Sequence, residues 1–541
     1  MSHPFATTLE VGSSLLNRTG SWRTERPVYV SRMPPCNHAC PAGEDVQRWL
    51  YHAESDDYQA AWKTLVERNP FPATMGRICY HPCETQCNRG QLDQSVNIHG
   101  VERFLGDEAI RRNWQFEKIA SSTGNHILIV GAGPCGLSAA YQLSRLGHDV
   151  TIHEAGPLPG GMMQFGIPQY RLPREILNAE VARIEAVGVT IILNKNASNL
   201  ADVIGSSHFD AVFLATGAQI AKRAWIPAGD ASRIVDALKL LRDSGFGQPT
   251  ELGRRVVIYG GGNTAMDAAR TAKRLGATDA LIVYRRTRER MPAHDEELQE
   301  ALEEGIKVKW LSTIKAADGQ SITVEKMRLN SAGFPEPTGE FETIEADSVV
   351  LALGQDTDLD FLRDVKGLQF QDGLIKVDDN MMTGYPGIFA GGDMVPSERT
   401  ATIAIGHGRK AALCIDAYLR NVAHEPESTP ELASFDRLNT WYYTDAPKTV
   451  QLVLDSVRRQ TTFEEVIAGL DQNNALFEAR RCLSCGNCFA CDNCYGVCPD
   501  NTVIKSKDAQ GYRFNYDFCK GCGLCAAECP CGAIRMEPEE I

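Results

Sequence analysis

The sequence contains no apolar run long enough to cross a membrane, and its N-terminal segment lacks the apolar core of a signal peptide. Basic residues are fewer than acidic ones, so the formal net charge is −14 over 541 residues. Nucleic-acid-binding proteins usually carry a basic stripe, so this class is disfavoured. These absences predict a cytoplasmic protein that acts on small molecules or protein partners, with neither a nucleic acid nor a membrane as partner.

Cysteine, by contrast, is abundant and unevenly distributed. Of the 18 cysteines, five lie within residues 36–87 and eleven within residues 482–531. Disulfides are rare in the cytoplasm, so grouped cysteines there predict metal sites. Only Cys135 and Cys414 stand alone, and we expect them to be buried thiols without chemistry.

The clearest motif is a strand–turn–helix–strand unit over residues 126–154. Its turn, GAGPCG, has the glycine spacing of a dinucleotide-binding fingerprint. Gly131 permits the tight turn, Gly133 lets the backbone approach a pyrophosphate, and Gly136 allows helix and strand to pack closely. Helix N–H groups then face the phosphates, and Glu154 is placed to accept a hydrogen bond from a ribose hydroxyl. An ordinary glycine turn is the alternative, which the register of strand, helix and acid disfavours.

Later segments are expected to complete this first nucleotide site. Residues 156–173, rich in glycine and proline, suit a loop that wraps a flat cofactor. Residues 209–218 predict a strand that ends in a turn, and residues 351–354 resemble that strand end. Residues 387–393 (GIFAGGD), followed by a helix from about residue 402, are suited to holding a ribityl chain and a flavin edge. The further flavin-binding positions predicted are Pro134, Gly161, Arg171, Thr216, Gly217, Gly392, Asp393, Thr402 and Ile403.

A second unit of the same kind begins at Arg254, so one nucleotide-binding domain is expected to be inserted into another. Its turn, GGGNTA, is the GxGxxA form of the fingerprint. Where an NAD-binding unit has an acid, this unit has YRRTR, and two guanidiniums there can hold a 2′-phosphate. A solvated charged loop is the alternative. The unit therefore predicts NADP rather than NAD, bound by Gly260, Gly262, Asn263, Thr264, Arg285 and Arg286.

The N-terminal cysteines flank a helical pattern. Residues 46–68 are expected to form a helix with core side chains Trp49, Leu50, Tyr58, Trp62 and Leu65. The flanking cysteines are Cys36, Cys40, Cys79, Cys83 and Cys87. A small helical domain that draws thiolates from two loops suits an iron–sulfur cluster, with zinc as the alternative. Iron–sulfur is favoured because a flavin site follows and zinc carries no electrons.

The C-terminal cysteines repeat one pattern. The run C-x2-C-x2-C-x3-C-P occurs at residues 488–499 and 519–530, as in two-cluster ferredoxins. The fourth cysteine of each run there binds the other cluster. The expected 4Fe–4S ligand sets are Cys488, Cys491, Cys494 and Cys529, and Cys519, Cys522, Cys525 and Cys498. Cys482, Cys485 and Cys531 fall outside the pattern and are expected to be unligated, although Cys482 and Cys485 continue the spacing and leave another ligand choice open.

From about residue 33 to 415 the chain resembles the glutamate synthase small subunit and its relatives, and its domain order resembles dihydropyrimidine dehydrogenase. The resemblance rests on ordered segments that include GRICYHPCETQC, GAGPCGLSAA, GGMMQFGIPQYRLP, FLATGA, GGGNTAMDAARTAKRLGA, YRRTRERMP and GIFAGGD. It implies FAD in the first unit, NADPH in the second, hydride transfer between them and single electrons passed to clusters. It requires no catalytic side chain.

The resemblance also maps one N-terminal cluster onto Cys40, Cys79, Cys83 and Glu102. Relatives with two N-terminal clusters carry a further CxxC upstream of Cys36, and this chain has no cysteine there. Cys36 and Cys87 are then left with half a ligand set. We expect one N-terminal cluster, with the choice among these six residues open.

The expected fold is α/β and α multi-domain. Its parts are a helical iron–sulfur domain (1–120), an FAD domain (121–224 and 350–420), an inserted NAD(P) domain (225–349), a helical linker (421–481) and a two-cluster ferredoxin-like domain (482–541). The linker is too short for the pyrimidine-reducing barrel of dihydropyrimidine dehydrogenase, which takes roughly 250 residues. The glutamate synthase small subunit does not normally end in a ferredoxin.

The protein is therefore expected to have a site where NAD(P)H delivers electrons and a series of clusters that carry them, but no evident substrate pocket. We expect a flavin and iron–sulfur oxidoreductase subunit that exchanges electrons between NAD(P)H and a catalytic partner or ferredoxin. Its tail resembles those accompanying 2-oxoacid:ferredoxin-type oxidoreductases, which favours a thiamine diphosphate-dependent partner. The alternatives are the reductase of a glutamate synthase-type enzyme, a stand-alone NADPH:ferredoxin oxidoreductase, and a redox-sensing scaffold, which the intact phosphate turns disfavour.

Overall fold

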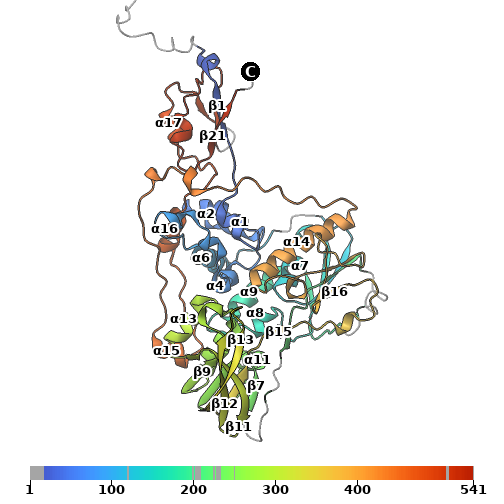
Figure 1. Cartoon of the computed structure of the whole chain (residues 1–541). Coiled ribbons are helices and arrows are strands. Elements are labelled where there is room, and N and C mark those ends of the chain that lie inside the picture. The colour runs from blue at the N-terminus through green and yellow to red at the C-terminus, as the bar shows by residue number, and fades with distance from the viewer. Residues whose placement is uncertain are drawn as a thin grey trace, which may run out of the picture.

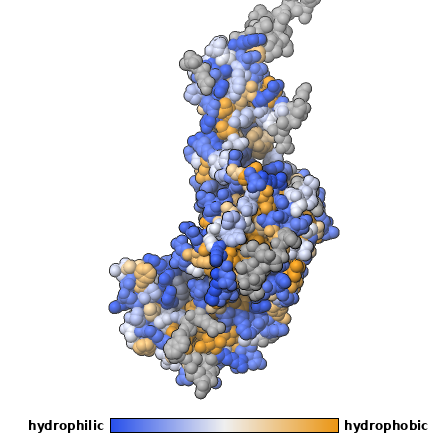
Figure 2. Space-filling view, turned by 90° about the vertical axis from the view of Figure 1, so that its right-hand side faces the viewer, coloured by the Kyte–Doolittle hydropathy of each residue, from blue (hydrophilic) through white to orange (hydrophobic). Residues whose placement is uncertain are grey.

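The computed structural model describes residues 18–117, 121–197, 200, 209–222, 226, 233–248, 250–506 and 511–539. Figure 1 shows an elongated molecule with a ferredoxin-like domain at one end and the second nucleotide-binding domain at the other. The helical domain and the first nucleotide-binding domain lie side by side between them. Figure 2 shows the narrow upper part projecting from the broader base, with polar and apolar residues mixed over this face. Within the described ranges, no helix has both the length and the apolar character to cross a membrane. The predicted α/β and α multi-domain class is confirmed.

The middle domain is helical. Its helices are α1 (Pro35–Ala39), α2 (Val46–Glu54), α3 (Tyr58–Val66), α4 (Pro72–Ile78), α5 (Pro82–Thr85) and α6 (Ile98–Arg111). The single helix predicted over residues 46–68 is wrong, because an acidic turn divides it into α2 and α3. Asp56 has a left-handed φ of 63°, and the Asp57 carboxylate accepts a hydrogen bond from the Ala60 N–H at 3.0 Å, capping α3. The five predicted core side chains are buried.

The first nucleotide-binding domain has a five-stranded parallel sheet in the order β18-β5-β2-β3-β4. The strands are β2 (His126–Val130), β3 (Asp149–His153), β4 (Thr190–Ile192), β5 (Ala211–Leu214) and β18 (Ile388–Ala390), and the helices are α7 (Pro134–Arg145), α8 (Met162–Phe165), α9 (Arg174–Ala186) and α14 (Ala401–Leu419). Helices α7 and α14 pack together, and the isolated cysteines Cys135 and Cys414 are buried in them, as expected.

The second nucleotide-binding domain repeats this plan with the sheet order β10-β9-β8-β14-β7, also parallel. Its elements are β7 (Arg233–Asp236), α11 (Ala237–Gly245), β8 (Arg255–Tyr259), α12 (Asn263–Arg274), β9 (Asp279–Val283), α13 (Asp295–Glu303), β10 (Lys307–Lys309) and β14 (Ser348–Leu351). An antiparallel meander, β11 (Ser312–Asp318), β12 (Ser321–Leu329) and β13 (Pro335–Glu345), precedes β14.

The predicted return to the flavin domain at residue 350 needs a correction. Strand β14 pairs with β8 inside the second sheet, just as β5 pairs with β2 in the first. Residues 351–354 resemble the end of β5 because both strands occupy the same place in repeated units. The chain returns later, through the two-stranded link of β6 (Ile220–Ala221) and β15 (Gln355–Asp356), before the small hairpin β16 (Phe370–Gln371) and β17 (Leu374–Ile375). The expected boundary at 224/225 lies outside the described residues.

The ferredoxin-like domain contains α17 (Asn493–Val497), β19 (Val503–Lys505), β20 (Tyr512–Phe514), α18 (Leu524–Ala527) and β21 (Ile534–Pro538). Strand β1 (Glu25–Tyr29) pairs antiparallel with β21, so this N-terminal segment lies in the ferredoxin-like domain rather than in the helical one. The expected assignment of all residues up to 120 to the helical domain is wrong at this strand. Pairing between the two ends of a chain leaves no local sequence signal.

The expected helical linker, residues 421–481, has only two α-helices, α15 (Ser456–Thr461) and α16 (Gln472–Arg480). Most of it is irregular and runs along the helical domain (Figure 1). Its polar side chains satisfy backbone groups there: the fully buried Arg481 donates to the carbonyls of Gln94 at 2.6 Å and Ser95 at 2.9 Å. The polar composition reflects these contacts, not a solvated helix.

Candidate functional site

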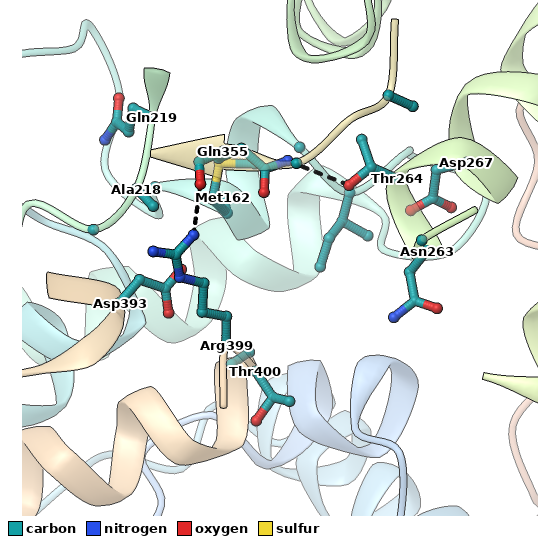
Figure 3. Close-up of a pocket in the computed structure, with 18 of the residues that line it drawn as sticks. Met162, Ala218, Gln219, Asn263, Thr264, Asp267, Gln355, Asp393, Arg399 and Thr400 are labelled. Carbon is teal, nitrogen blue, oxygen red and sulfur yellow. Dashed lines mark hydrogen bonds between the residues drawn. The ribbon is translucent and has the colours of Figure 1, made fainter. Parts of the chain in front are cut away.

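One cavity of about 890 Å³ joins the two nucleotide-binding domains. Residues of the flavin side, such as Asp393, Arg399 and Thr400, and of the second domain, such as Asn263 and Thr264, surround a common space (Figure 3). Sequence-predicted positions lining it are Gly131, Gly133, Pro134, Glu154, Gly161, Arg171, Thr216, Gly217, Gly260, Gly262, Asn263, Thr264, Arg285, Arg286, Gly392 and Asp393.

The first glycine turn has the backbone that its sequence requires. Gly131 has a φ of 106°, and a Cβ there would lie 2.5 Å from the Ala215 carbonyl oxygen. A Cβ on Gly136 would lie 2.0 Å from the Gly131 carbonyl oxygen, so Gly136 serves helix–strand packing and does not line the cavity. The buried Glu154 accepts hydrogen bonds from the Ala132 N–H at 2.8 Å and the Gly156 N–H at 2.6 Å. Its carboxylate is thereby held at the cavity wall.

Both glycine turns lead into helices whose N-termini fit phosphate groups. Helices α7 and α12 have Gly133 and Gly262 as N-caps, and neither helix has a side-chain cap. Helices α2, α3, α6, α11 and α14, by contrast, are capped by Asp, Asn or Thr side chains. A Cβ on Gly262 would enter open space. The uncapped N–H groups beside an open cavity are the arrangement that binds a pyrophosphate.

The second unit replaces the acid with an aromatic ring and two arginines. Tyr284 follows β9 as Glu154 follows β3, and its hydroxyl donates to the Arg290 carbonyl at 2.6 Å. Arg285 and Arg286 follow on the cavity wall, and the buried Nε of Arg286 has no hydrogen-bond partner among the described residues. An unpartnered guanidinium nitrogen beside a second cation fits the 2′-phosphate of NADP.

Two residues that the sequence did not indicate connect the nucleotide sites. Arg399 donates to the Gln355 carbonyl at 2.6 Å, and the Gln355 amide donates to the Thr264 hydroxyl at 3.4 Å (Figure 3). Asp393 lies beside Arg399 (Figure 3); burial raises the pKa of Asp393, and the Arg399 charge partly opposes that rise. Arg399 and Gln355 lie outside any recognisable motif, so no local signal could have indicated them.

The predicted flavin ligand Arg171 has partners in the other domain. It donates to the Asp267 carboxylate of α12 at 2.9 Å and also pairs with Glu297 of α13. The guanidinium therefore ties the loop of the flavin domain to the inserted domain while lining the cavity. Ile403 is also placed differently from the prediction: it is not among the lining residues, and its N–H is capped by the Thr400 hydroxyl at 3.2 Å.

Four of the six N-terminal ligand candidates lie together. Cys40, Cys79, Cys83 and Glu102 surround one small cavity, whose wall also includes Glu44 and Thr402. The Asn69 amide bridges Glu44 at 2.8 Å and Glu102 at 3.0 Å, which holds both buried carboxylates. Glu44 is an additional oxygen donor that the sequence reasoning missed. The donor set fits an iron–sulfur cluster with three thiolates and one carboxylate.

This cluster site is next to the large cavity. The neighbours of Cys79 in sequence, Ile78 and Tyr80, both line the large cavity. The predicted flavin ligand Thr402 is not among the lining residues; its hydroxyl donates to the Cys79 sulfur at 3.2 Å, and the His81 N–H donates to the same sulfur at 3.4 Å. Thr402 therefore links the first turn of α14 to Cys79, a predicted cluster ligand.

The ferredoxin cysteines form the two groups that the doubled run predicts. Cys498, Cys519, Cys522 and Cys525 surround one small cavity. Cys494 lies close enough to Cys488, Cys491 and Cys529 to interact with them electrostatically. Within the described part of the chain, no three His, Cys, Asp or Glu side chains converge closely enough for a single metal ion.

Comparisons with known proteins agree with this arrangement. Residues 125–408 match the pyridine nucleotide-disulphide oxidoreductase family, residues 19–114 match dihydropyrimidine dehydrogenase domain II with its 4Fe–4S cluster, and residues 512–535 match a 4Fe–4S binding domain. The chain is 35% identical to the NADP(+)-dependent formate dehydrogenase subunit beta of Moorella thermoacetica, over 83% of this chain and 70% of that protein.

Two further relatives have the same character. The NADPH-Fe(3+) oxidoreductase subunit beta of Geobacter sulfurreducens is 31% identical, over 83% of this chain and 75% of its own length. The NAD-dependent dihydropyrimidine dehydrogenase subunit PreT of Escherichia coli is 32% identical, over 71% of this chain and 91% of its own length. Each is named as a subunit that uses a nicotinamide cofactor.

Proposed function

Because the chain belongs to the pyridine nucleotide-disulphide oxidoreductase family, we propose that it is the NADPH-linked electron-transfer subunit of a larger redox enzyme. It is an oxidoreductase that uses FAD, NAD(P) and 4Fe–4S clusters. The observation that carries the proposal is the shared cavity: both glycine turns face one space, and Cys79, for which we propose a role as cluster ligand, lies between two of its lining residues.

The chain's own residues have separable roles in this proposal. The turn at Gly131–Gly133 and the N-terminus of α7 hold the FAD pyrophosphate, and Glu154 accepts from its ribose. The turn at Gly260–Gly262 holds NADPH, with Arg285 and Arg286 on its 2′-phosphate. Bound FAD would supply the conversion of a two-electron hydride into single electrons. The remaining flavin positions, Thr216, Gly217, Gly392 and Asp393, line the same space and are proposed to contact the isoalloxazine and ribityl groups.

The ferredoxin-like domain supports exchange with a protein partner. Cys488, Cys491 and Cys522 are exposed, so their clusters lie close to the surface of this chain. Exposed cysteine ligands of this kind require a reducing compartment, which supports a cytoplasmic location. A partner that docks here could pass single electrons without a substrate pocket in this chain.

For the partner we propose a thiamine diphosphate-dependent 2-oxoacid oxidoreductase, because the ferredoxin-like tail resembles those that accompany such enzymes. A formate dehydrogenase catalytic subunit is the second candidate, since the relative from Moorella thermoacetica is the beta subunit of such an enzyme. The test is anaerobic purification of the native complex, with mass spectrometry of stoichiometric partners. A thiamine diphosphate-binding subunit supports the first candidate, and a formate dehydrogenase catalytic subunit supports the second.

Two other results would overturn the partner proposal. A large amidotransferase subunit would indicate a glutamate synthase-type enzyme. A chain that purifies alone, yet reduces ferredoxin with NADPH, would be a stand-alone reductase. If neither NADPH nor NADH bleaches the bound flavin, the electron-transfer function itself is wrong.

A further inference from the structure

Cys36 and Cys87 lie outside the site formed by Cys40, Cys79, Cys83 and Glu102. Cys36 is buried in α1, and Cys87 is half-buried just after α5, against the same hydrophobic cluster. The sequence left these two thiols with half of a ligand set. The structure brings two more cysteines to them from nearly 400 residues further along the chain, namely Cys482 and Cys485.

The segment that carries these cysteines is fixed to the loop that follows Cys87. Arg89 donates to the Arg481 carbonyl at 2.9 Å, and the Asn97 N–H donates to the Glu478 carboxylate at 2.8 Å. Cys482 packs against the same hydrophobic cluster as Cys36 and Cys87. Helix α16 also packs on α2 and α6. The position of the two cysteines is therefore built into the domain interface.

The four sulfurs share one buried environment. Burial is the main cause that raises the pKa of Cys36, and the neighbouring thiols of Cys87, Cys482 and Cys485 raise it further. A backbone N–H group points at one of the sulfurs, because the Ser484 N–H donates to Cys482 at 3.4 Å. Such N–H to sulfur bonds commonly surround iron–sulfur clusters and tune their potentials.

We propose that Cys36, Cys87, Cys482 and Cys485 bind a second 4Fe–4S cluster at the junction of the helical and ferredoxin-like domains. Four thiolates are a complete ligand set for such a cluster. The chain thus replaces the missing upstream CxxC with a CxxC supplied by its C-terminal half. The expectation that Cys482 and Cys485 are unligated thiols, and that the helical domain holds one cluster, is revised accordingly.

The location connects this site to the ferredoxin clusters. The Gly486 N–H, next to Cys485, donates to the Cys531 carbonyl at 2.7 Å, and Cys531 contacts the predicted cluster ligand Cys529 at 3.7 Å between their sulfurs. The Tyr443 hydroxyl also donates to the carbonyl of Leu483, which lies between Cys482 and Cys485, at 3.0 Å.

This inference deepens the proposed function and rests on it for the direction of electron flow. NADPH supplies two electrons, and each cluster carries one at a time. The order from the flavin would be the Cys40 site, the Cys36 site and then the ferredoxin-like domain.

The test is the iron, sulfide and zinc content of the full-length chain purified anaerobically. The proposal predicts about 16 iron and 16 sulfide ions per chain and no stoichiometric zinc, from four 4Fe–4S clusters. The Cys482→Ser/Cys485→Ser variant should lose about four iron ions and keep the ferredoxin electron paramagnetic resonance signals. The Cys414→Ala variant, which changes a buried thiol outside every cysteine group, should keep the full iron content.

Three results would overturn the site. These are about 12 iron ions in the unaltered chain, one zinc ion per chain lost with Cys482 and Cys485, or an unchanged iron content in the double variant. Should the double variant fold poorly, the count in the unaltered chain and in Cys36→Ser still decides. A separate readout is stopped-flow mixing with NADPH: in the double variant the flavin should bleach normally, and the ferredoxin clusters should be reduced at least tenfold more slowly. Absence of flavin bleaching in the unaltered chain would overturn the electron-transfer function and leave the metal count valid.

Discussion

The two nucleotide-binding domains follow one plan and differ at a single decisive place. In both, the first glycine of the turn donates its N–H to the last residue of the second strand, Gly131 to His153 at 2.9 Å and Gly260 to Val283 at 3.2 Å. The next residue is Glu154 in one domain and Tyr284 in the other. One position, immediately after the second strand, therefore separates the two sites.

The difference extends to the middle residue of each turn. In the first domain the Ala132 N–H is used to hold the Glu154 carboxylate. In the second, a Cβ on Gly261 would lie 2.4 Å from the Tyr284 ring, so the aromatic side chain requires glycine there. The pairs Ala–Glu and Gly–Tyr are thus physically coupled. Sequences that exchange only one member of a pair should lose the fit of the turn.

The largest effect is expected from side chains added to the first glycine of each turn. The Gly131→Ala and Gly260→Ala variants place a Cβ 2.5 Å and 2.1 Å from a carbonyl oxygen, at φ values of 106° and 151°. Strain of about 3 kcal/mol, together with the clash with the carbonyl oxygen, should weaken the binding of the matching nucleotide more than about 100-fold. Gly131→Ala should lose FAD on desalting, whereas Gly260→Ala should keep FAD and lose reduction by NADPH.

The matched control for this pair is Gly339→Ala, which has a φ of 79° in the meander with no atom within 4 Å of its Cβ. It should keep FAD and NADPH reduction while losing some stability. If Gly131→Ala and Gly260→Ala lose the same cofactor, the assignment of the two sites is wrong.

The next effect separates NADPH from NADH. Replacing Arg285 and Arg286 by Ala removes the cations proposed for the 2′-phosphate, at about 2–3 kcal/mol for charge-assisted bonds. The KM for NADPH should rise about 30- to 100-fold, with little change in the KM for NADH. Arg288→Ala, an exposed arginine in the next turn, is the control and should change neither. Equal losses for both cofactors would contradict the assignment.

Each nucleotide-binding domain also contains a buried glutamate that stabilises the fold, and the two stabilising contributions depend on pH in opposite ways. Glu180 of α9 accepts from the Ala73 and Thr74 N–H groups of α4 at 2.7 Å and 3.0 Å, and burial raises its pKa to about 7. The folded state keeps this proton to a higher pH than the unfolded state does. The stabilisation is therefore full below about pH 4.5 and is lost as the pH rises to about 7.

Glu304, in the second domain, stabilises the fold with the opposite pH dependence. Against the cost of burial, hydrogen bonds from Arg274 and Arg270 lower its pKa. Its stabilisation is therefore present above about pH 4.5 and is lost as the pH falls below that value. Chemical denaturation between pH 4.5 and 7 should show a fall of about 2.6 kcal/mol in the free energy of unfolding that Glu180→Gln removes. A slope that remains unchanged in Glu180→Gln would show that this carboxyl is ionised in the folded protein across the window.

The smallest effect concerns the ribose. Glu154→Gln keeps the shape but replaces one acceptor oxygen by a donor that faces a backbone N–H. A loss of about 1 kcal/mol should weaken FAD binding about fivefold and leave the KM for NADPH unchanged. Tyr284→Phe, the equivalent position in the other domain, should leave FAD binding unchanged. Fluorescence titration of the flavin-depleted protein measures both, and no loss in Glu154→Gln would exclude Glu154 from FAD binding.

Most features that depend on neighbouring residues could be predicted from the sequence. The turn around Gly131, the arginines after β9 and the doubled cysteine run are each complete within a few positions, so their local backbone follows from residue type and spacing. The division of residues 46–68 into two helices was missed, although Asp56 and Asp57 are present, because the apolar pattern continues through the turn.

Features assembled from distant segments could not be predicted in this way. The strand β14 was assigned to the wrong sheet, since two repeated units carry the same strand ending. Arg399 meets Gln355, and Thr402 meets Cys79, only because the domains pack together. Neither contact has a signature at the level of spacing.

By itself, the amino-acid sequence determined the two glycine turns, the use of FAD, NAD(P) and 4Fe–4S clusters, and the class of chemistry. Only the tertiary structure decided that β1 completes the ferredoxin-like domain and that Cys482 and Cys485 reach Cys36 and Cys87. The physical reason is the range of the interactions involved. Turn geometry and short ligand spacings are local, whereas the packing of α16 on the helical domain depends on the whole fold.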